Sequence, residues 1–153
     1  MTAACIVHVV DDDASWRVSV KRLLSAVGYN VALYESAQQF LDSADLALPC
    51  CVLLDLRMPG LNGLQVQERL TEMQRRVSIV FVSAHGDIPT SVVAIKSGAE
   101  DFLTKPVETE VLLAIVERAI ARDRAHRGGD GQLTLWRSRI AALTPMERKV
   151  FDL

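Results

Sequence analysis

Four aspartates stand directly after two short apolar runs of the chain. An acidic triplet at residues 11–13 follows the run 6–10, and Asp55 follows the run 51–54. If both runs are buried strands of one parallel sheet, these carboxylates meet at its carboxyl edge, where open α/β sheets bind their ligands. Clustered carboxylates repel one another, and a divalent cation that prefers oxygen ligands, most naturally Mg²⁺, relieves that repulsion. The pattern therefore predicts a magnesium site.

Asp55 stands alone on its strand and precedes the turn-forming residues 57–60. Its carboxylate is expected at the edge, where it could attack a phosphoryl group while Mg²⁺ neutralises the incoming charge. Ser83 and Lys105 follow two further apolar runs, and a hydroxyl and an ammonium there could hold phosphoryl oxygens. A cis bond between Lys105 and Pro106 is one way to direct the lysine over the edge, and the sequence leaves cis or trans open.

Each of these residues also has an ordinary structural interpretation. An acidic run after a strand is commonly a solvated loop or a helix cap, and a single serine or lysine at a strand end says little. The combination is more informative, because an acidic pair, a single aspartate, a hydroxyl and a Lys-Pro pair each follow a different apolar run. That joint occurrence favours phosphoryl chemistry.

The order of elements predicts an α/β fold, a doubly wound parallel sheet of five strands with helices on both faces. The expected strands are the apolar runs at residues 6–10, 30–34, 51–54, 79–82 and 101–103. Between and after them, apolar residues recur with helical spacing and predict helices, and one further helix near 36–45 is less clearly marked. The stripes are Trp16, Val20, Leu23, Leu24 and Val27; Val66, Leu70 and Met73; Ile88, Val92 and Ile95; and Leu112, Ile115, Val116 and Ala119. Asp13 or Ser15 should cap the first helix, and Gly28 should end it.

Composition limits the possible classes of protein. The chain has 153 residues, half of them hydrophobic, which is enough for one core and a short appendage. Residues 1–120 contain 10 Lys/Arg and 15 Asp/Glu, against 7 and 4 in residues 121–153, so any nucleic-acid contact must come from the tail or beyond it. No apolar run approaches the roughly 18 residues of a membrane span. The three cysteines lack metal-ligand spacing and fit buried thiols in a reducing, cytoplasmic environment.

The glycine-rich segment 128–131 is a flexible break of the kind that separates domains. The main domain is therefore expected to cover residues 1–127, followed by a partly helical linker over 128–143. Residues 144–147 have the form of a capped helix start, so a second domain is expected to begin at 144–153. That helix would present an apolar face with nothing after it to cover the face, which suggests a chain cut short inside the second domain.

The sequence resembles the receiver domain of two-component response regulators, from residue 5 to about residue 122. The segments that carry the resemblance are 9–13, 55–63, 83–87 and 101–106. Residues 85–87 and 143–148 look most like the FixJ/NarL class, in which the tail opens a LuxR-type helix-turn-helix that binds DNA. The resemblance implies a flavodoxin-like receiver with strand order 2-1-3-4-5 and a helical C-terminal linker.

The resemblance also implies how the aspartates divide their roles. Asp55 would be phosphorylated by a sensor histidine kinase, and the receiver would catalyse its own phosphotransfer and dephosphorylation without being a classical enzyme. Asp11 and Asp12 would hold Mg²⁺ together with the Asp55 carboxylate and the Arg57 backbone carbonyl. Asp13 falls outside this pair and is expected to cap the first helix.

Signal output follows from the same resemblance. Ser83 and Lys105 would bind the aspartyl phosphate, and Phe102 would be the aromatic switch that turns inward when Ser83 moves. The face made by the fourth helix and the fifth strand, with the fifth helix possible, would form a homodimer on phosphorylation and control transcription through a C-terminal DNA-binding domain. Residues expected on this face include Val93, Lys96, Asp101 and Arg118.

Three alternatives remain for comparison. A Mg²⁺-dependent aspartyl phosphohydrolase would typically have a second aspartate two residues after the nucleophile, where this chain has Arg57. A pseudo-receiver that only binds partners would lack one of the core positions. A stand-alone receiver would not need the capped helix expected at 144–153.

Overall fold

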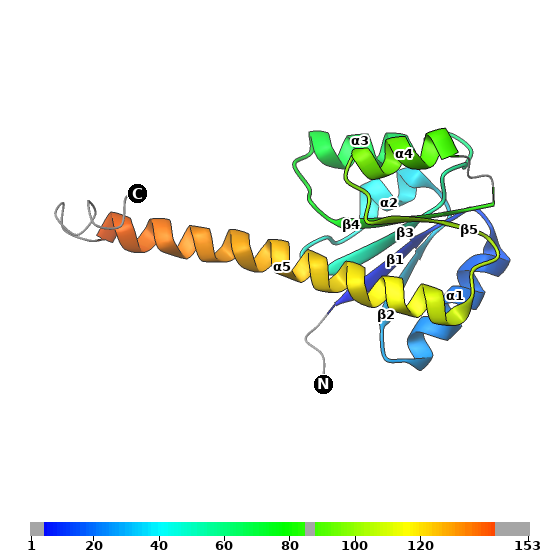
Figure 1. Cartoon of the computed structure of the whole chain (residues 1–153), viewed down its shortest axis with the longest axis horizontal. Coiled ribbons are helices and arrows are strands. Elements are labelled where there is room, and N and C mark those ends of the chain that lie inside the picture. The colour runs from blue at the N-terminus through cyan, green and yellow to red at the C-terminus, as the bar shows by residue number, and fades with distance from the viewer. Residues whose placement is uncertain (1–4, 85–87, 143–153) are drawn as a thin grey trace. The chain divides into compact units, whose positions relative to one another are not determined.

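The computed structural model describes the chain over residues 5–84 and 88–142. Its described strands form one parallel sheet in the order β2-β1-β3-β4-β5, which confirms the predicted topology. They are β1 (Ile6–Val10), β2 (Asn30–Tyr34), β3 (Cys50–Leu54), β4 (Ser78–Ser83) and β5 (Asp101–Thr104). The helices between and after them are α1 (Ala14–Ala26), α2 (Ala37–Ser43), α3 (Gly63–Glu72), α4 (Ile88–Lys96) and α5 (Thr109–Ala142) (Figure 1).

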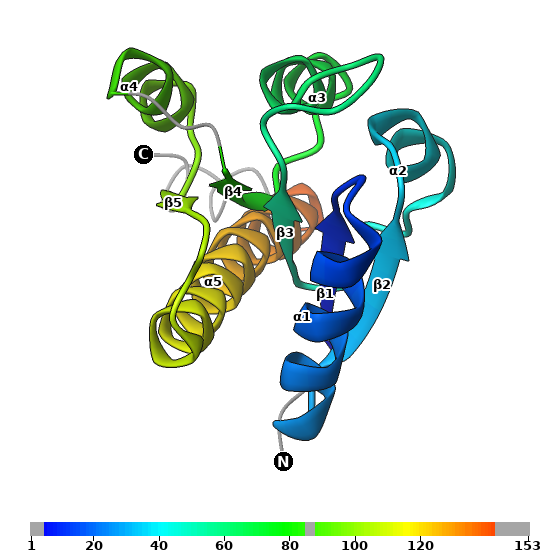
Figure 2. The ribbon, with the colours of Figure 1, turned by 90° about the vertical axis from the view of Figure 1, so that its right-hand side faces the viewer.

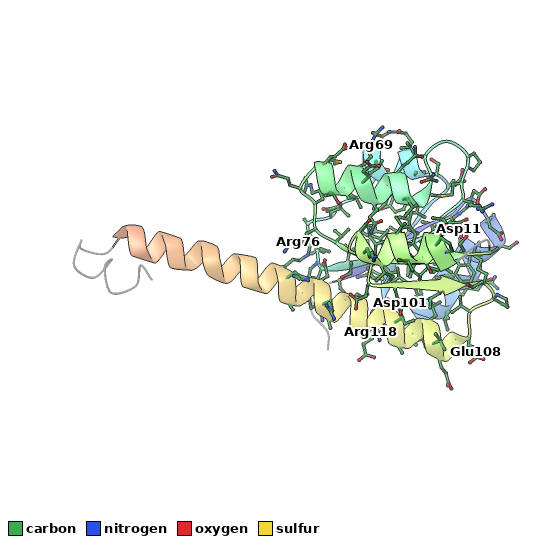
Figure 3. All side chains as sticks on the ribbon, turned by 45° about the horizontal axis from the view of Figure 1, so that its top comes forward. Asp11, Arg69, Arg76, Asp101, Glu108 and Arg118 are labelled. Carbon is green, nitrogen blue, oxygen red and sulfur yellow. The ribbon has the colours of Figure 1, made fainter. Side chains whose placement is uncertain are left out.

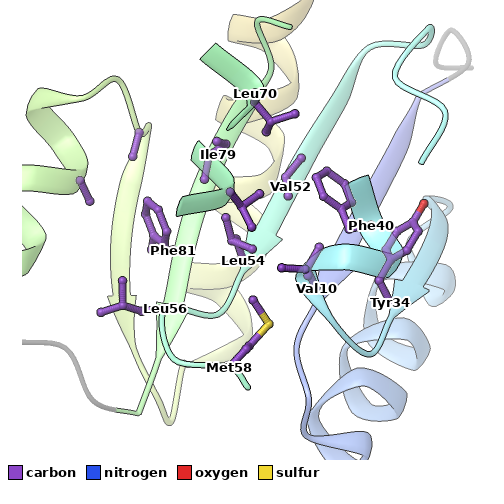
Figure 4. Packing of buried hydrophobic residues seen from close by; sticks show 14 of the residues in the cluster. Val10, Tyr34, Phe40, Val52, Leu54, Leu56, Met58, Leu70, Ile79 and Phe81 are labelled. Carbon is purple, nitrogen blue, oxygen red and sulfur yellow. The ribbon is translucent and has the colours of Figure 1, made fainter. Parts of the chain in front are cut away.

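The sheet separates two hydrophobic cores, because successive side chains of a strand point to opposite faces. In β1, Val10 packs with Phe40 in the core beneath α2, α3 and α4, whereas Val9 packs with Leu24 in the core beneath α1 and α5. Figure 2 shows the two groups of helices on opposite sides of the sheet. Figure 4 shows part of the first core, where Phe81 of β4 and Leu54 of β3 lie side by side on adjacent strands. The inner strands are buried on both faces, as expected for a doubly wound sheet.

The ends of α1 follow the expected local rules. The Asp13 side chain accepts hydrogen bonds from the backbone N–H groups of Ser15 and Trp16, so Asp13 rather than Ser15 is the N-cap. Gly28 ends the helix with φ +98°, a backbone conformation that only glycine adopts without strain. Val27 is wrongly placed in the predicted apolar stripe, since it is the C-cap residue of α1 and is exposed.

The predicted stripes of the third and fourth helices need correction. Met73 is the C-cap of α3 and is exposed, because the helix ends one residue earlier. In α4, Val92 and Ile95 are 43% and 44% exposed, and the buried residue is the small Ala94. The side chain of Ile88 lies outside the described residues. The helix α4 has apolar residues around most of its circumference. Their spacing therefore does not define a single buried face, and the prediction chose the wrong residues.

The glycine-rich segment 128–131 does not interrupt the helix, because α5 continues through it to Ala142. Each glycine costs a helix only ~1 kcal/mol relative to alanine, which a long helix with good flanking helix formers can absorb. The chain divides into two compact units, Met1–Asp123 and Arg124–Leu153. The proposed boundary at residue 127 stays a prediction, and the expected helix at 144–153 lies outside the described residues. No described helix is both long and apolar enough to cross a membrane.

The start of α3 leaves no room for a side chain at its first residue. A capping box between Asn62 and Gln65 fixes this turn, and Gly63 lies against the backbone of the neighbouring strand end. A Cβ atom on Gly63 would lie 2.7 Å from the Asp55 carbonyl oxygen and 2.7 Å from Cε1 of Phe81. Gly63 therefore sets how closely α3 approaches the strand that carries Asp55.

We expect Gly63→Ala to lower the free energy of unfolding by about 1–3 kcal/mol, the usual cost of overpacking. An unobstructed glycine-to-alanine change inside a helix would instead raise it by about 1 kcal/mol, so the two effects have opposite signs. Urea unfolding followed by circular dichroism measures the difference. A midpoint equal to or above that of the wild type would contradict the close approach.

Candidate functional site

The three carboxylates of the predicted metal site come together at the carboxyl ends of β1 and β3. These strands are adjacent and parallel, with Val10 opposite Leu54, and the Asp55 N–H donates to the Val10 carbonyl oxygen at 2.9 Å. The residues that follow the two strands are therefore side by side. One ligand oxygen from each of Asp11, Asp12 and Asp55 lies within 4.8 Å of the others.

The chemistry of this donor set fits a hard divalent cation. All three ligands are carboxylate oxygens, Asp11 and Asp55 are buried, and Asp12 is exposed and open to solvent. The N–H of Arg57 donates to Asp55 Oδ1 at 3.2 Å, which places the backbone of Arg57 beside the cluster, while its side chain is exposed. Asp13 is the N-cap of α1, as predicted; its carboxylate is not one of the three, but its backbone N–H donates to Asp11 Oδ1 at 2.9 Å.

Lys105 brings a positive charge to the same edge. Its Nζ lies 2.7 Å from Asp11 Oδ2, and its side chain is only 16% exposed. The Lys105–Pro106 peptide bond is cis, the isomer that the sequence left open. Ser83, the last residue of β4, is fully buried, and its carbonyl oxygen accepts a 3.0 Å hydrogen bond from the Lys105 N–H. All four strand ends singled out in the sequence thus converge on one site.

The electrostatics of the site centre on Asp55. Burial and the nearby charge of Asp11 raise the pKa of the Asp55 carboxyl from 3.8 to about 6. The Arg57 N–H, the Lys105 ammonium and a hydrogen bond with the Ser83 side chain lower the pKa, but do not outweigh the first two effects. Ionisation of Asp55 in the folded protein therefore costs free energy, and a cation bound beside the carboxylate would lower that cost.

This raised pKa gives a stability change with a definite sign. Folded Asp55 keeps its proton up to about pH 6, whereas the unfolded chain releases it near pH 3.8. The folded state binds more protons in this window, so its stability falls as the pH rises from about 4 to about 6. With a chelator present, Asp55→Asn should therefore gain stability relative to the wild type over this window, by at most about 3 kcal/mol. Urea unfolding at several pH values tests this prediction. A difference in free energy of unfolding between the variant and the wild type that does not change with pH would contradict it.

Phe102, the expected switch residue, lies on β5 and is half-buried. Its ring centroid is 5.9 Å from that of Phe81, and it packs against the core beneath α2, α3 and α4.

The residues expected at the output face lie on neighbouring elements. Arg118 pairs with Asp101 at 2.9 Å and with Glu100 at 3.6 Å, and Figure 3 shows Asp101 and Arg118 on the side of β5 and α5. Val93 on α4 is exposed. The residues expected at an output face are thus accessible.

Two residues of α1 that the sequence pattern did not indicate as site residues also belong to the site. The Arg17 guanidinium donates to the Asp11 carbonyl oxygen at 2.6 Å and pairs with Glu35 at 3.7 Å. The Lys105 Nζ lies 4.9 Å from the centroid of the Trp16 ring. Their position offered a signal, because a helix capped at Asp13 brings its first turn to the same edge as the acidic cluster.

A further buried polar group lies away from the site. His8 on β1 is fully buried, and its Nδ1 lies 3.0 Å from the Tyr34 hydroxyl oxygen. Burial lowers the pKa of His8 to about 4, against the opposing effect of Asp45. The imidazole is therefore neutral near pH 7 and packs with the rings of Tyr34 and Phe40 as part of the core. The three cysteines are likewise buried thiols that form no disulfide, as predicted.

Comparison with known proteins gives a consistent result. FixJ, a transcriptional regulatory protein of Bradyrhizobium diazoefficiens, is 38% identical over 99% of this chain and 74% of its own length. Nodulation protein W of the same organism is 40% identical over 97% of this chain and 65% of its own length. The structure of the response regulator StyR superposes with a TM-score of 0.89 at 37% identity, covering 98% of this chain and 76% of that one.

The chain thus spans about two thirds to three quarters of the length of these relatives. The family model of the response regulator receiver domain matches residues 7–117, which include β1 from its second residue, the whole of β2 to β5 and the whole acidic cluster. Receiver domains are regulatory modules of two-component systems and not classical enzymes. With this match, the receiver fold and relatives more than 30% identical over nearly the whole chain, the protein belongs to the family of response regulator receiver domains.

Proposed function

We propose that the protein is a phosphorylation-controlled response regulator, in which Asp55 accepts a phosphoryl group from a phosphohistidine of a sensor histidine kinase. The convergence of Asp55 with Asp11 and Asp12 within 4.8 Å, beside the Lys105 ammonium, carries this proposal. The relatives support a role in transcription, since FixJ is a transcriptional regulatory protein. The buried thiols, which form no disulfide, fit a cytoplasmic protein.

The phosphotransfer step follows from the arrangement of the side chains. A carboxylate oxygen of Asp55 attacks the phosphorus atom, the P–N bond breaks, and the leaving imidazole takes up a proton from solvent. Asp11, Asp12, the Asp55 carboxylate and the Arg57 carbonyl would hold Mg²⁺, which supplies positive charge next to the transferring group. Attack of water on the acyl phosphate later releases inorganic phosphate and restores the carboxylate.

Ser83 and Lys105 would bind the phosphoryl oxygens, the serine through its hydroxyl and the lysine through its ammonium. Ser83 ends β4 and Lys105 follows β5, so movement of both toward the phosphoryl group would shift the two strand ends together. Phe102 lies on β5 and would turn further inward as Ser83 moves. The output would pass to the face of α4 and β5, with α5 taking part.

This face would form a homodimer when Asp55 is phosphorylated. Val92, Val93 and Ile95 of α4 are exposed and apolar, which suits association with a second copy. The dimer would bring two C-terminal DNA-binding domains of the LuxR helix-turn-helix type to their sites, since the acidic receiver itself is poorly suited to contact DNA.

The test is incubation with acetyl phosphate and Mg²⁺, followed by intact-mass measurement. We expect one phosphoryl group per chain. We expect no uptake when a chelator is present during the incubation, because the transfer needs the metal. Acid and base lability would identify an acyl phosphate rather than a phosphate ester. Uptake that does not need Mg²⁺, or no uptake from either acetyl phosphate or a phosphorylated histidine kinase, would overturn the proposal.

A further inference from the structure

Two different groups contact the Lys105 ammonium. Asp11 Oδ2 lies 2.7 Å from Nζ, and the centroid of the Trp16 ring lies 4.9 Å from the same atom. The distance to the ring is within the range of a cation–π interaction, in which the negative face of an indole attracts a cation. The lysine side chain is mostly buried, so solvent screens these contacts only in part.

The Trp16 ring is held in place by the structure around it. The backbone N–H of Trp16 donates to the capping carboxylate of Asp13 at 3.3 Å, which fixes the first turn of α1, and the half-buried Trp16 side chain packs against the core beneath α1 and α5. The ring and the Asp11 carboxylate therefore form two fixed sides of a position for the ammonium. A lysine side chain is otherwise flexible, with ~2 kcal/mol of rotamer entropy to lose, so a second fixed contact favours this one position.

In this position Lys105 and a divalent cation compete for the same carboxylate. Asp11 is one of the three carboxylates that would hold the cation, and its Oδ2 lies 2.7 Å from the ammonium. Cation binding would bring a second positive charge next to Nζ, and like charges at this range repel. A Lys105 ammonium that moved toward a phosphoryl group on Asp55 would give up part of its contact with Asp11. Any group that stabilises the contact between Lys105 and Asp11 therefore opposes both events.

We infer that Trp16 is a positioning residue whose ring holds Lys105 on Asp11 in the resting state and so sets how readily the site accepts a divalent cation. This inference rests on the proposed function, because it concerns the same site. It assigns to the first turn of α1 a part in tuning the receiver, in addition to its packing.

The first test is calorimetric titration of the chain with Mg²⁺ at constant pH. Trp16→Leu keeps apolar bulk but has no aromatic face, and we expect it to bind Mg²⁺ about two- to fivefold more tightly than the wild type, the change expected from loss of one cation–π contact. Trp16→Phe keeps a weaker aromatic face and should fall between the two. Val18→Ala, at an exposed position of the same helix, should leave the affinity unchanged.

The effect must depend on Lys105. In a Lys105→Met background, Trp16→Leu should no longer change the Mg²⁺ affinity, because the charge that the ring holds is gone. A purely structural role of Trp16 would give the same change with or without the lysine. Proton NMR gives a readout without metal: the ε-methylene of Lys105 should be shifted upfield by the ring current in the wild type and lose that shift in Trp16→Leu.

The outcomes separate this inference from the proposed function. If the wild type binds Mg²⁺ and takes up a phosphoryl group on Asp55, but Trp16→Leu has equal or weaker Mg²⁺ affinity, the role of Trp16 is refuted and the proposed function stands. If the wild type does not bind Mg²⁺, both fail. If the Trp16→Leu chain does not fold, the Trp16→Phe chain provides the test. A Mg²⁺ affinity and a Lys105 ε-methylene chemical shift that both equal those of the wild type would then refute the inference.

Discussion

Asp55→Asn should remove all phosphoryl uptake from acetyl phosphate and from a phosphorylated histidine kinase. The amide has the size and shape of the carboxylic acid but lacks the anionic oxygen that attacks phosphorus. Because the change also removes one of the three mutually repelling carboxylates, the variant should fold at least as stably as the wild type at neutral pH. Intact-mass measurement after incubation gives the label, and circular dichroism gives the fold.

Two further variants show whether the loss is specific. Asp42→Asn removes an exposed carboxylate on α2 that bonds to Gln38, away from the acidic cluster, and should take up the label as the wild type does. Asp12→Asn keeps the nucleophile but removes one expected metal ligand, so it should still be labelled, more slowly and at higher Mg²⁺ concentrations. Full labelling of a folded Asp55→Asn would show that another residue is the acceptor.

The site was predictable from the sequence because parallel topology fixes where strand ends lie. Once residues 6–10 and 51–54 are recognised as strands of one parallel sheet, the residues that follow them must meet at one edge. This argument needs no side-chain geometry, and it correctly brought Asp11, Asp55 and Lys105 together. The strand order was confirmed as well, with each strand boundary within one residue of its expected place.

The errors arose where a local pattern does not determine the tertiary contact. The apolar residues of α4 outnumber the positions that its contact with the sheet can cover, so periodicity could not identify Ala94 as the buried one. Glycines at 128–131 indicated a break, yet helix continuity there depends on the whole of α5. The contact between Trp16 and Lys105 joins residues 89 positions apart, and no spacing rule predicts it.

The exposed apolar residues of α4 lead to a second prediction with a large expected effect, which concerns dimerisation. Val92, Val93 and Ile95 form an apolar surface on α4 that the described part of the chain leaves uncovered, next to the ion pair of Asp101 with Arg118. If phosphorylation creates a homodimer through α4 and β5, these side chains would lie at the apolar centre of the interface, where most of the binding energy is concentrated. A charge at this position would be buried without a partner on dimerisation.

Val93→Glu should therefore weaken the phosphorylation-dependent dimer by roughly 100-fold or more, because burying an unpaired carboxylate costs several kcal/mol. Phosphoryl uptake at Asp55 should remain, since Val93 is 51% exposed and its substitution leaves the acidic cluster intact. Val18→Glu is the matched control, because Val18 is 48% exposed on α1, on the opposite side of the sheet. Sedimentation velocity of the phosphorylated chains measures the dimer. Equal dimerisation of the Val93→Glu and Val18→Glu chains would place the interface elsewhere, whereas loss in Val93→Glu alone would link phosphorylation of Asp55 to the α4 surface.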